Sequence, residues 1–570
     1  MHPLARTCMA VALVASWGVG QRPAPADLVL TNGKIVTVDP ELGVAKGIAV
    51  RGDRIVAVGT IREIQKHVGN TTKFIDLEGK LVIPGFIEGH AHFVGIGSAK
   101  QILDLTKVTS WDDVVDMVAA AVRQAKPGEW IRGRGWHQEK WSKTPQNAVG
   151  GFPTHGSLSA VSPDNPVGLT HASGHAAFYN AKAMQLAGIS KSTPNPSGGE
   201  ILRDGSGNAI GVFSETAQGL VGRTRILGGL RRTRAERHAA LEWSIELADR
   251  ECLENGITSF QDAGSTLATV TVLKGMAARG KLGTRLWVML RDGNGRLARG
   301  LADVRLIGFG NNHLTVRAIK RTIDGALGSR GAWLLEPYSD SPKSSGLNTA
   351  SVESVTRTAQ LAAQHGYQFC VHAIGDKANR VALDIFEAAF KDLAELAKAR
   401  WRIEHAQHIH PVDIPRFGKL GVIASMQGVH CTSDGPWVVP RLGEQRAETG
   451  AYVWRSLLES GAIVTNGTDA PVEDIDPIAS YYASVSRRMK NGKVFFAAQR
   501  MTRMEALASY TISCAKAAFE EDIKGTLTPG KLADMVVLSK DILTIPEAEI
   551  LDTVVLYTIV GGKVLYKKAN

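Results

Sequence analysis

The stretch that decides the fold is residues 81–93, LVIPGFIEGHAHF. An apolar run typical of a buried strand leads through a Pro-Gly pair to His90 and His92, which lie two residues apart. Because side chains alternate between the two faces of a strand, both imidazoles are expected to point the same way. Histidine is the commonest metal ligand, so this pair favours a metal site at a strand end. A His-x-His pair also occurs by chance in loops, and the other segments decide between these interpretations.

The middle of the chain alternates short apolar runs with helical patterns. A capping box from Thr233 to Glu236 opens one helix that ends at Gly256, and residues 351–365 form a second helical pattern that ends at Gly366. Eight strand candidates alternating with helices predict an α/β fold, a (β/α)8 TIM barrel. The candidates are residues 81–92, 258–262, 285–290, 315–323, 368–373, 402–406, 422–427 and 462–469.

Both ends of the chain read as short strands. In residues 26–80, Asn32-Gly33 and Gly52-Asp53 are hairpin turn signals between alternating apolar runs, and residues 525–570 repeat this style. We therefore expect residues 26–80 and 525–570 to form one composite β-sandwich domain. Residues 81–99 and 231–524 would then form the metal-dependent barrel.

The first two strand candidates lie too far apart for an ordinary barrel. A TIM barrel takes roughly 250 residues, so each strand and its helix need about 30. Residues 100–230, rich in Gly, Pro, Trp and His, are therefore predicted to be an insertion after the first strand. Loops at that end of a barrel surround the active site, so we expect a lid subdomain that shapes the substrate pocket.

The N-terminus differs from the rest of the chain. His2 and Arg6 precede an apolar run over residues 8–20, which is long enough for a secretory signal and too short for a membrane span. We predict a signal peptide over residues 1–25 and export to the periplasm or the medium. If this segment is not a signal, the protein is expected to be cytoplasmic. No later segment is long and apolar enough to form a stable membrane span.

Composition describes an ordinary globular protein of more than one structural unit. The chain has 570 residues, 44% of them hydrophobic and 21% charged, with a net charge of +11. The basic residues are spread along the sequence and are not interleaved with aromatics in a block, so nucleic acid binding is not expected. Self-association into a homo-oligomer is left open by the sequence.

Further candidate metal ligands lie at the ends of predicted strands. His372 ends YQFCVHAIGD, His405 ends RIEHAQ and Asp469 ends AIVTNGTDAPVED. With His90 and His92 they make four histidines and one carboxylate at one face of the predicted barrel, where barrel enzymes carry their chemistry. Imidazole and carboxylate together suit zinc, and also manganese, iron or cobalt.

Lys320 is a sixth candidate, and spacing alone does not favour it. Strand alternation places Lys320 on the same face as Ala318 and Thr322, opposite Arg317 and Arg321. A charged lysine inside a barrel is costly, and two arginines are poorly suited to lie under a helix layer. Spacing alone therefore favours an exposed lysine.

Several segments, taken in order, resemble the amidohydrolase superfamily, and in particular amidohydrolase family 3, which includes N-substituted formamide deformylases. They are PGFIEGHAH, IKRTIDGALGSRGAWLLEPY, VHAIGDKAN, RIEHAQ, SMQGVH, NGTDAPVED and GTLTPGKLAD. The resemblance runs from about residue 27 to the C-terminus. It implies a metal-bearing barrel with a composite β domain, and a divalent metal, with zinc favoured, in one or two copies.

The resemblance also implies roles for individual residues. Lys320 stands where related enzymes carry a carboxylated, metal-bridging lysine, so it implies a CO2-derived carbamate on this side chain. The other predicted ligands fall at two metals, with His90, His92 and Asp469 at one and His372 and His405 at the second.

The implied activity is metal-dependent hydrolysis of a carbon–nitrogen, non-peptide amide bond in a small molecule of the N-acyl or N-formyl amine type. A metal-activated hydroxide would attack the carbonyl carbon, and Asp469 would pass the proton of this water to the leaving amine. Four further polar residues are expected either to contact substrate or to support the metal ligands, namely His175, Asp324, Gln427 and His430.

Alternative functions stay open at this point. A cyclic amide, a dipeptide or an ester could be the substrate, because the lid sets specificity. Deamination is disfavoured, since Gly375 stands where the resembling deaminases carry a glutamate. A non-catalytic scaffold related to the same superfamily is the alternative from another class. Such a scaffold would not depend on bound metal.

Overall fold

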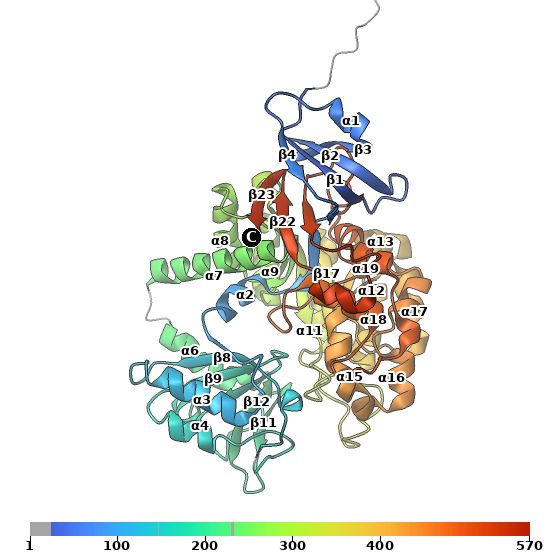
Figure 1. Ribbon diagram of the computed structural model, residues 1–570. Helices are drawn as coiled ribbons and strands as arrows, with labels where there is room; N and C mark the ends of the chain where they lie inside the picture. The colour runs from blue at the N-terminus through green and yellow to red at the C-terminus, as the bar shows by residue number, and fades with distance from the viewer. Residues whose placement is uncertain (1–23, 146, 230–232, 391, 570) are drawn as a thin grey trace, which may run out of the picture.

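The computed structural model describes residues 24–145, 147–229, 233–390 and 392–569, with three β-sheets arranged as Figure 1 shows. The predicted signal peptide over residues 1–25 falls almost entirely outside this part of the chain, so export stays a prediction. No helix in the described ranges has the length and apolar character needed to cross a membrane.

The central sheet is a nearly closed, parallel, barrel-like sheet. Its main path has eight strands, and all of their pairings are parallel. Between the first and last of these strands, Gly89 N donates to Asn466 O at 3.0 Å and Asp469 N donates to His90 O at 2.8 Å. The strands are β6 (Phe86–Ala91), β13 (Ile257–Ser265), β14 (Arg285–Leu290), β16 (Leu314–Thr322), β17 (Gln368–Ala373), β18 (Arg402–His405), β19 (Ile423–Ser425) and β20 (Val464–Thr465). Each of the eight strand candidates therefore overlaps a barrel strand.

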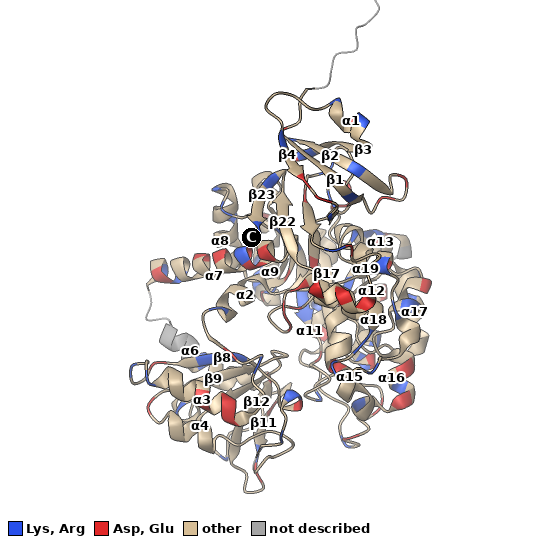
Figure 2. Ribbon diagram, in the orientation of Figure 1, with Lys and Arg blue, Asp and Glu red and all other residues tan. Residues whose placement is uncertain are grey.

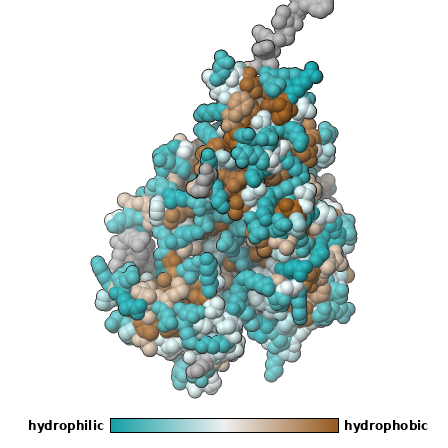
Figure 3. All heavy atoms as spheres, in the orientation of Figure 1, coloured by the Kyte–Doolittle hydropathy of each residue, from teal (hydrophilic) through white to brown (hydrophobic). Residues whose placement is uncertain are grey.

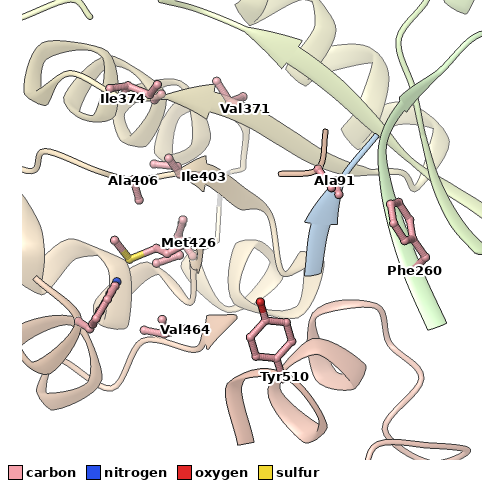
Figure 4. Packing of buried hydrophobic residues seen from close by; sticks show 14 of the residues in the cluster. Ala91, Phe260, Val371, Ile374, Ile403, Ala406, Met426, Val464 and Tyr510 are labelled. Atoms are coloured by element: carbon pink, nitrogen blue, oxygen red, sulfur yellow. The ribbon is translucent and has the colours of Figure 1, made fainter. Parts of the chain in front are cut away.

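Helices pack around this sheet. The predicted start of one helix and the predicted end of another are both found. Helix α7 begins with a capping box at Thr233, and helix α11 ends at Gly366, which adopts a left-handed conformation. Between sheet and helices lies a large apolar core, where Figure 4 shows Val371 and Ile403 on the neighbouring strands β17 and β18, and Phe260 on β13. The main helices are α7 (Arg234–Glu254), α8 (Leu267–Ala278), α9 (Asn294–Val304), α11 (Val352–His365), α12 (Asp376–Ala389), α14 (Ile414–Leu420), α15 (Gly428–Leu442) and α18 (Pro477–Ser486).

The opening stretch of the sequence is divided between two sheets. Strand β5 (Leu81–Pro84) pairs with β1 and β21 in a sheet built from the chain ends, and only β6 belongs to the barrel. The expectation of a single barrel strand over residues 81–92 is therefore wrong. The chain crosses between the sheets at Gly85, where a Cβ atom would lie 2.2 Å from the Thr258 side chain. Only glycine allows this close approach.

The second sheet joins the two ends of the chain. Its strands run in the order β23-β22-β21-β5-β1-β2-β3, with β4 also paired to β1. The hydrogen bonds define one sheet, so a sandwich of two separate sheets stays a prediction. In addition to β5, the strands are β1 (Leu28–Val36), β2 (Val44–Arg51), β3 (Arg54–Gly59), β4 (Lys73–Asp76), β21 (Met535–Leu538), β22 (Val555–Val560) and β23 (Lys563–Lys567).

One of the two predicted hairpin turns in this sheet is found. Gly52-Asp53 connects β2 to β3, as expected. Asn32-Gly33 instead lies inside β1, where the register with β2 shifts. A Cβ at Gly33 would lie 2.6 Å from Leu77, because this irregular part of β1 packs directly against the turn before β5. The local signal was a bulge and not a hairpin.

The insertion forms a third sheet with its own core. Its strands are β7 (Leu103–Asp104), β8 (Ile131–Trp136), β9 (Val167–His171), β10 (Ala176–Tyr179), β11 (Gly199–Arg203) and β12 (Ala209–Glu215), in the order β11-β12-β10-β9-β8-β7. Helices α3 (Trp111–Val122), α4 (Gly156–Val161), α5 (Ala181–Leu186) and α6 (Gln218–Gly229) accompany it. Its core includes Trp111, Trp136 and Phe178. Residues between the first two barrel strands therefore form a folded unit and not a long loop.

Charged residues form no single block along the ribbon in view. In Figure 2, lysine and arginine are distributed among aspartate and glutamate over the helices and the loops. Figure 3 shows hydrophobic surface over the sheet from the chain ends, where Val44 and Phe74 are exposed.

A buried ion pair joins the barrel to the terminal sheet and can be tested by unfolding. Arg285 donates to Asp534 at 2.8 and 3.0 Å, and both side chains are at most 5% exposed. Replacing Arg285 with Met would leave a buried carboxylate unpaired, which costs about 3–5 kcal/mol. We expect urea unfolding to show this loss. Lys143→Gln, which removes an exposed ion pair with Asp112, should cost about 1 kcal/mol or less.

Candidate metal centre

One group of ligands forms where β6 meets the segment after β20. His92 Nε2 lies 3.2 Å from Asp469 Oδ1, and His90 Nε2 lies 3.6 Å from the same oxygen. The ligand atoms of these three residues all lie within 4.8 Å of one another. The backbone bond from Asp469 N to His90 O fixes this geometry across the barrel seam. Three predicted ligands are thus brought together within reach of one ion.

A second group shares Asp469. Its ligand atoms, from His405, His430 and Asp469, also lie within 4.8 Å of one another. The ring centroid of His405 lies 4.6 Å from that of His90 and 4.5 Å from that of His372. The structure therefore brings all four predicted imidazoles to one place. His430, expected as a substrate contact or a support residue, stands among the candidate ligands.

Four buried atoms of this site lack hydrogen-bond partners among the described residues. Among the described residues, none bonds to Nε2 of His90, His372 or His430, or to Oδ1 of Asp469. A buried polar atom without a partner costs about 1–3 kcal/mol, so four in one cluster need an explanation. A divalent cation accepts these lone pairs, and imidazole with carboxylate is a donor set suited to zinc-like ions. The residues present therefore fit a divalent metal.

Two of the imidazoles are oriented through their other nitrogen. His90 Nδ1 bonds to Glu404, whose carboxylate is held by Arg402 at 2.7 and 3.0 Å. Burial alone would raise the pKa of Glu404, but Arg402 and His90 outweigh it and hold the pKa well below its usual range. His405 Nδ1 bonds to Gln427 Oε1 at 2.8 Å. Both arrangements leave Nε2 available to a metal.

Lys320 lies inside the barrel, so the interpretation from spacing alone is wrong. Its side chain is 3% exposed, and burial lowers its pKa to about 8. The outward arginines are accommodated among the helices and loops. Arg317 lies over the Phe519 ring at 3.8 Å, and Arg321 Nε donates to Thr358 Oγ1 at 3.0 Å. Because these contacts accommodate both arginines on the outer face of the barrel, the arginines do not argue against an inward-pointing Lys320.

Asp324 supports the loop after β17 rather than the substrate cavity. Its carboxylate accepts backbone hydrogen bonds from Trp333, Ile374 and Gly375 at 2.8–3.0 Å. Burial raises its pKa to about 7, against the lowering effect of these bonds. Its Oδ1 also lies 3.5 Å from His372 Nε2. This carboxylate therefore fixes the backbone beside His372.

His175 reaches the site from the insertion. Its Nδ1 bonds to Glu215 Oε2 at 2.8 Å, and its ring centroid lies 5.1 Å from that of His372. Burial opposes the charged form, but Glu215 outweighs it and raises the pKa of His175. The nearby aromatic residue of the insertion, Trp136, does not line the site and is fully buried in the core of the insertion.

A cavity of about 750 Å³ opens over the ligands, between the barrel and the insertion. Of the predicted site residues it contacts His92, His175, Lys320, His372, His405 and Asp469. His430 lines a smaller adjoining hollow of about 50 Å³. Gln427 and Asp324 line neither, which favours a supporting role for both.

Sequence reasoning missed the residues that support or surround the ligands. Glu404 stands next to His405 in a motif that was already singled out, but nothing local shows that it bonds to His90 across the barrel. Arg132, Arg134 and Arg291 also line the cavity. The alternating arginines in IRGRGW were the one available signal for the first two.

Comparison with known proteins identifies the family. A sequence profile described as the amidohydrolase family matches residues 73–566. The chain belongs to the amidohydrolase family. The resemblance to family 3 noted from the sequence is thereby confirmed.

Relatives in this family match nearly the whole chain. The protein LONG AFTER FAR-RED 3 of Arabidopsis thaliana is 34% identical over 95% of this chain and 92% of its own length. The N-substituted formamide deformylase of Arthrobacter pascens is 28% identical over 95% of this chain and 99% of its own length. A solved structure of an uncharacterized metal-dependent hydrolase from Pyrococcus horikoshii OT3 superposes with a TM-score of 0.72 and 28% identity, covering 91% of this chain and 99% of that one. Together with the family match, these similarities support a hydrolase.

The supporting role of Gln427 can be tested through metal affinity. Replacing Gln427 with Leu removes the acceptor that orients His405, which should weaken zinc binding by about 10- to 100-fold. Competition with a chromophoric chelator measures this affinity. Gln427→Glu retains an acceptor and should restore most of it. A raised KM with unchanged zinc affinity would instead indicate a substrate contact.

Proposed function

We propose that this protein is a metal-dependent hydrolase that cleaves carbon–nitrogen, non-peptide amide bonds in small molecules of the N-acyl or N-formyl amine type. The observation that carries the proposal is the cluster of unpartnered Nε2 and Oδ1 atoms beneath a cavity of about 750 Å³. Similarity to the formamide deformylase of Arthrobacter pascens over most of both chains supports this bond type.

The proposed metal ligands are the residues that meet at this cluster. Zinc, as one or two ions, suits their donor set. The proposal includes a CO2-derived carbamate on Lys320, whose buried side chain faces the same cavity. The set is His90, His92, Lys320, His372, His405 and Asp469.

A divalent ion held here would polarise the amide carbonyl and lower the pKa of a bound water. Asp469 is placed to move the proton. Burial raises the pKa of its carboxyl group, but the imidazoles of His92 and its neighbours outweigh burial and keep the pKa well below its usual range. The carboxylate can therefore accept the proton of the attacking water and deliver it to the leaving nitrogen.

The insertion supplies the opposite wall of the proposed site. His175, held by Glu215, faces the cavity from the side away from the barrel. Its imidazole can donate a hydrogen bond to the carbonyl oxygen as negative charge develops there. We propose residues 100–230 as the lid that excludes water and shapes the substrate pocket.

The proton-transfer role of Asp469 gives the sharpest test. Asp469→Asn keeps the size of the side chain but removes the base, so hydrolysis should fall by about 10²- to 10⁴-fold while the protein stays folded. Metal-reconstituted enzyme should be screened against N-formyl amines, N-acyl amines, N-acyl amino acids, cyclic imides and aryl esters. Release of amine or acid is the measurement.

Two controls separate chemistry from folding. Asp474→Asn alters an exposed carboxylate in the segment that follows Asp469 and should leave turnover unchanged. Thermal unfolding and metal content should be measured on both variants. Normal turnover by Asp469→Asn would exclude its role as base. Turnover that survives complete metal removal would refute the metal-dependent mechanism.

A further inference from the structure

The cavity over the metal ligands is lined by several arginines. Three arginines line it, namely Arg132, Arg134 and Arg291, against the acidic side chains of Glu215 and Asp469. Lys320 is not counted among the cations, because the proposed carbamate would remove its positive charge. Both acids are already engaged, Glu215 with His175 and Asp469 with the histidines around it. A bound divalent cation would add positive charge beside these arginines. The part of the cavity wall that carries these arginines is therefore suited to binding an anion.

Two of these arginines come from the insertion and have different roles. Strand alternation puts Arg132 and Arg134 on the same side of β8, and both line the cavity. Arg134 is committed to the fold, because its guanidinium donates to Pro471 O at 3.0 Å and to Ala172 O at 2.9 Å. Arg132 lines the same cavity and is exposed to solvent.

Arg291 approaches from the barrel side. It directly follows β14, and its stem lies over Gly264 at the end of β13. Gly264 has a φ of +147°, and a Cβ there would lie 2.8 Å from Arg291 Cδ, so the backbone leaves room for this side chain. No hydrogen bond or ion pair with the described residues holds the Arg291 guanidinium, although it lines the cavity.

We propose that the substrate carries a carboxylate in addition to the scissile amide, and that Arg132 and Arg291 bind it from the insertion side and the barrel side of the cavity. The inference rests on the proposed hydrolysis of N-acyl or N-formyl amines and narrows its substrate class. Guanidinium groups match a carboxylate through paired N–H donors, and such charge-assisted hydrogen bonds are strong in a partly enclosed site. The metal site can then position the amide carbonyl while the arginines hold the acid.

Matched substrates test this charge preference. Each N-formyl or N-acetyl amino acid should be compared with the N-acyl amine that lacks only the carboxylate. We expect kcat/KM of the zinc-loaded enzyme to favour the acid by about tenfold or more, as for hydrogen bonds to a charged group. Equal or better turnover of the neutral amides across the panel would overturn the proposal.

Variants assign the preference to the two arginines. Arg132→Gln and Arg291→Gln should each raise KM for the acid by about tenfold and leave the neutral amide within about twofold. Arg291→Lys should recover part of the loss, because charge returns without the paired donors. The control is Arg299→Gln, an exposed arginine on α9 outside the cavity lining, which should change neither substrate. Unchanged KM in both Gln variants would refute these binding roles.

Equilibrium binding separates this proposal from the proposed reaction. Calorimetry of zinc-loaded enzyme with phenylacetate and phenylacetamide should show tighter binding of the anion, reduced by added salt and by either Gln variant. Binding that depends on Arg132 and Arg291, without turnover of any amide, would support the anion site and count against the reaction. Phenylacetate binding equal in wild type and both variants would overturn the anion site, whatever the enzyme hydrolyses.

Discussion

The structure depends on one desolvated carboxylate. Asp469 is buried among imidazoles at the seam where the barrel sheet closes, and its backbone N–H completes that seam by bonding to His90. A carboxylate without a compensating partner is among the costliest groups to bury. Barrel closure and site chemistry are therefore coupled, because the bond that joins the last strand segment to the first also sets the distance between this oxygen and the histidines.

Patterns local in sequence predicted the fold well. The capping box at Thr233 and the stop at Gly366 specify helix ends through hydrogen bonds within a few residues, and both are found. Errors arose where a distant segment decides the local conformation. Gly85 marks a crossing between sheets because Thr258 lies against it, and Gly33 lies in a bulge because Leu77 packs there. Neither neighbour is visible in a local pattern.

The candidate site was predictable in its ligands and not in its surroundings. Five predicted ligands lie at strand ends, and barrel topology alone brings strand ends together. Lys320 required more, because its inward orientation depends on how Arg317 and Arg321 are accommodated on the other face. The partners of the ligands, such as Glu404 for His90, are set by packing across the barrel and leave no signature in spacing.

The hydrogen bond from Arg134 to Pro471 links the movement of the insertion to the barrel segment that follows Asp469. This bond to Pro471 O ties the insertion to a residue only two beyond Asp469, and the second bond of Arg134, to Ala172 O, lies within the insertion. An outward swing of the insertion wide enough to break the bond to Pro471 would remove one of the contacts on the segment that follows Asp469, the proposed base. Opening of the cavity and the position of the proposed base are therefore linked through the side chain of Arg134.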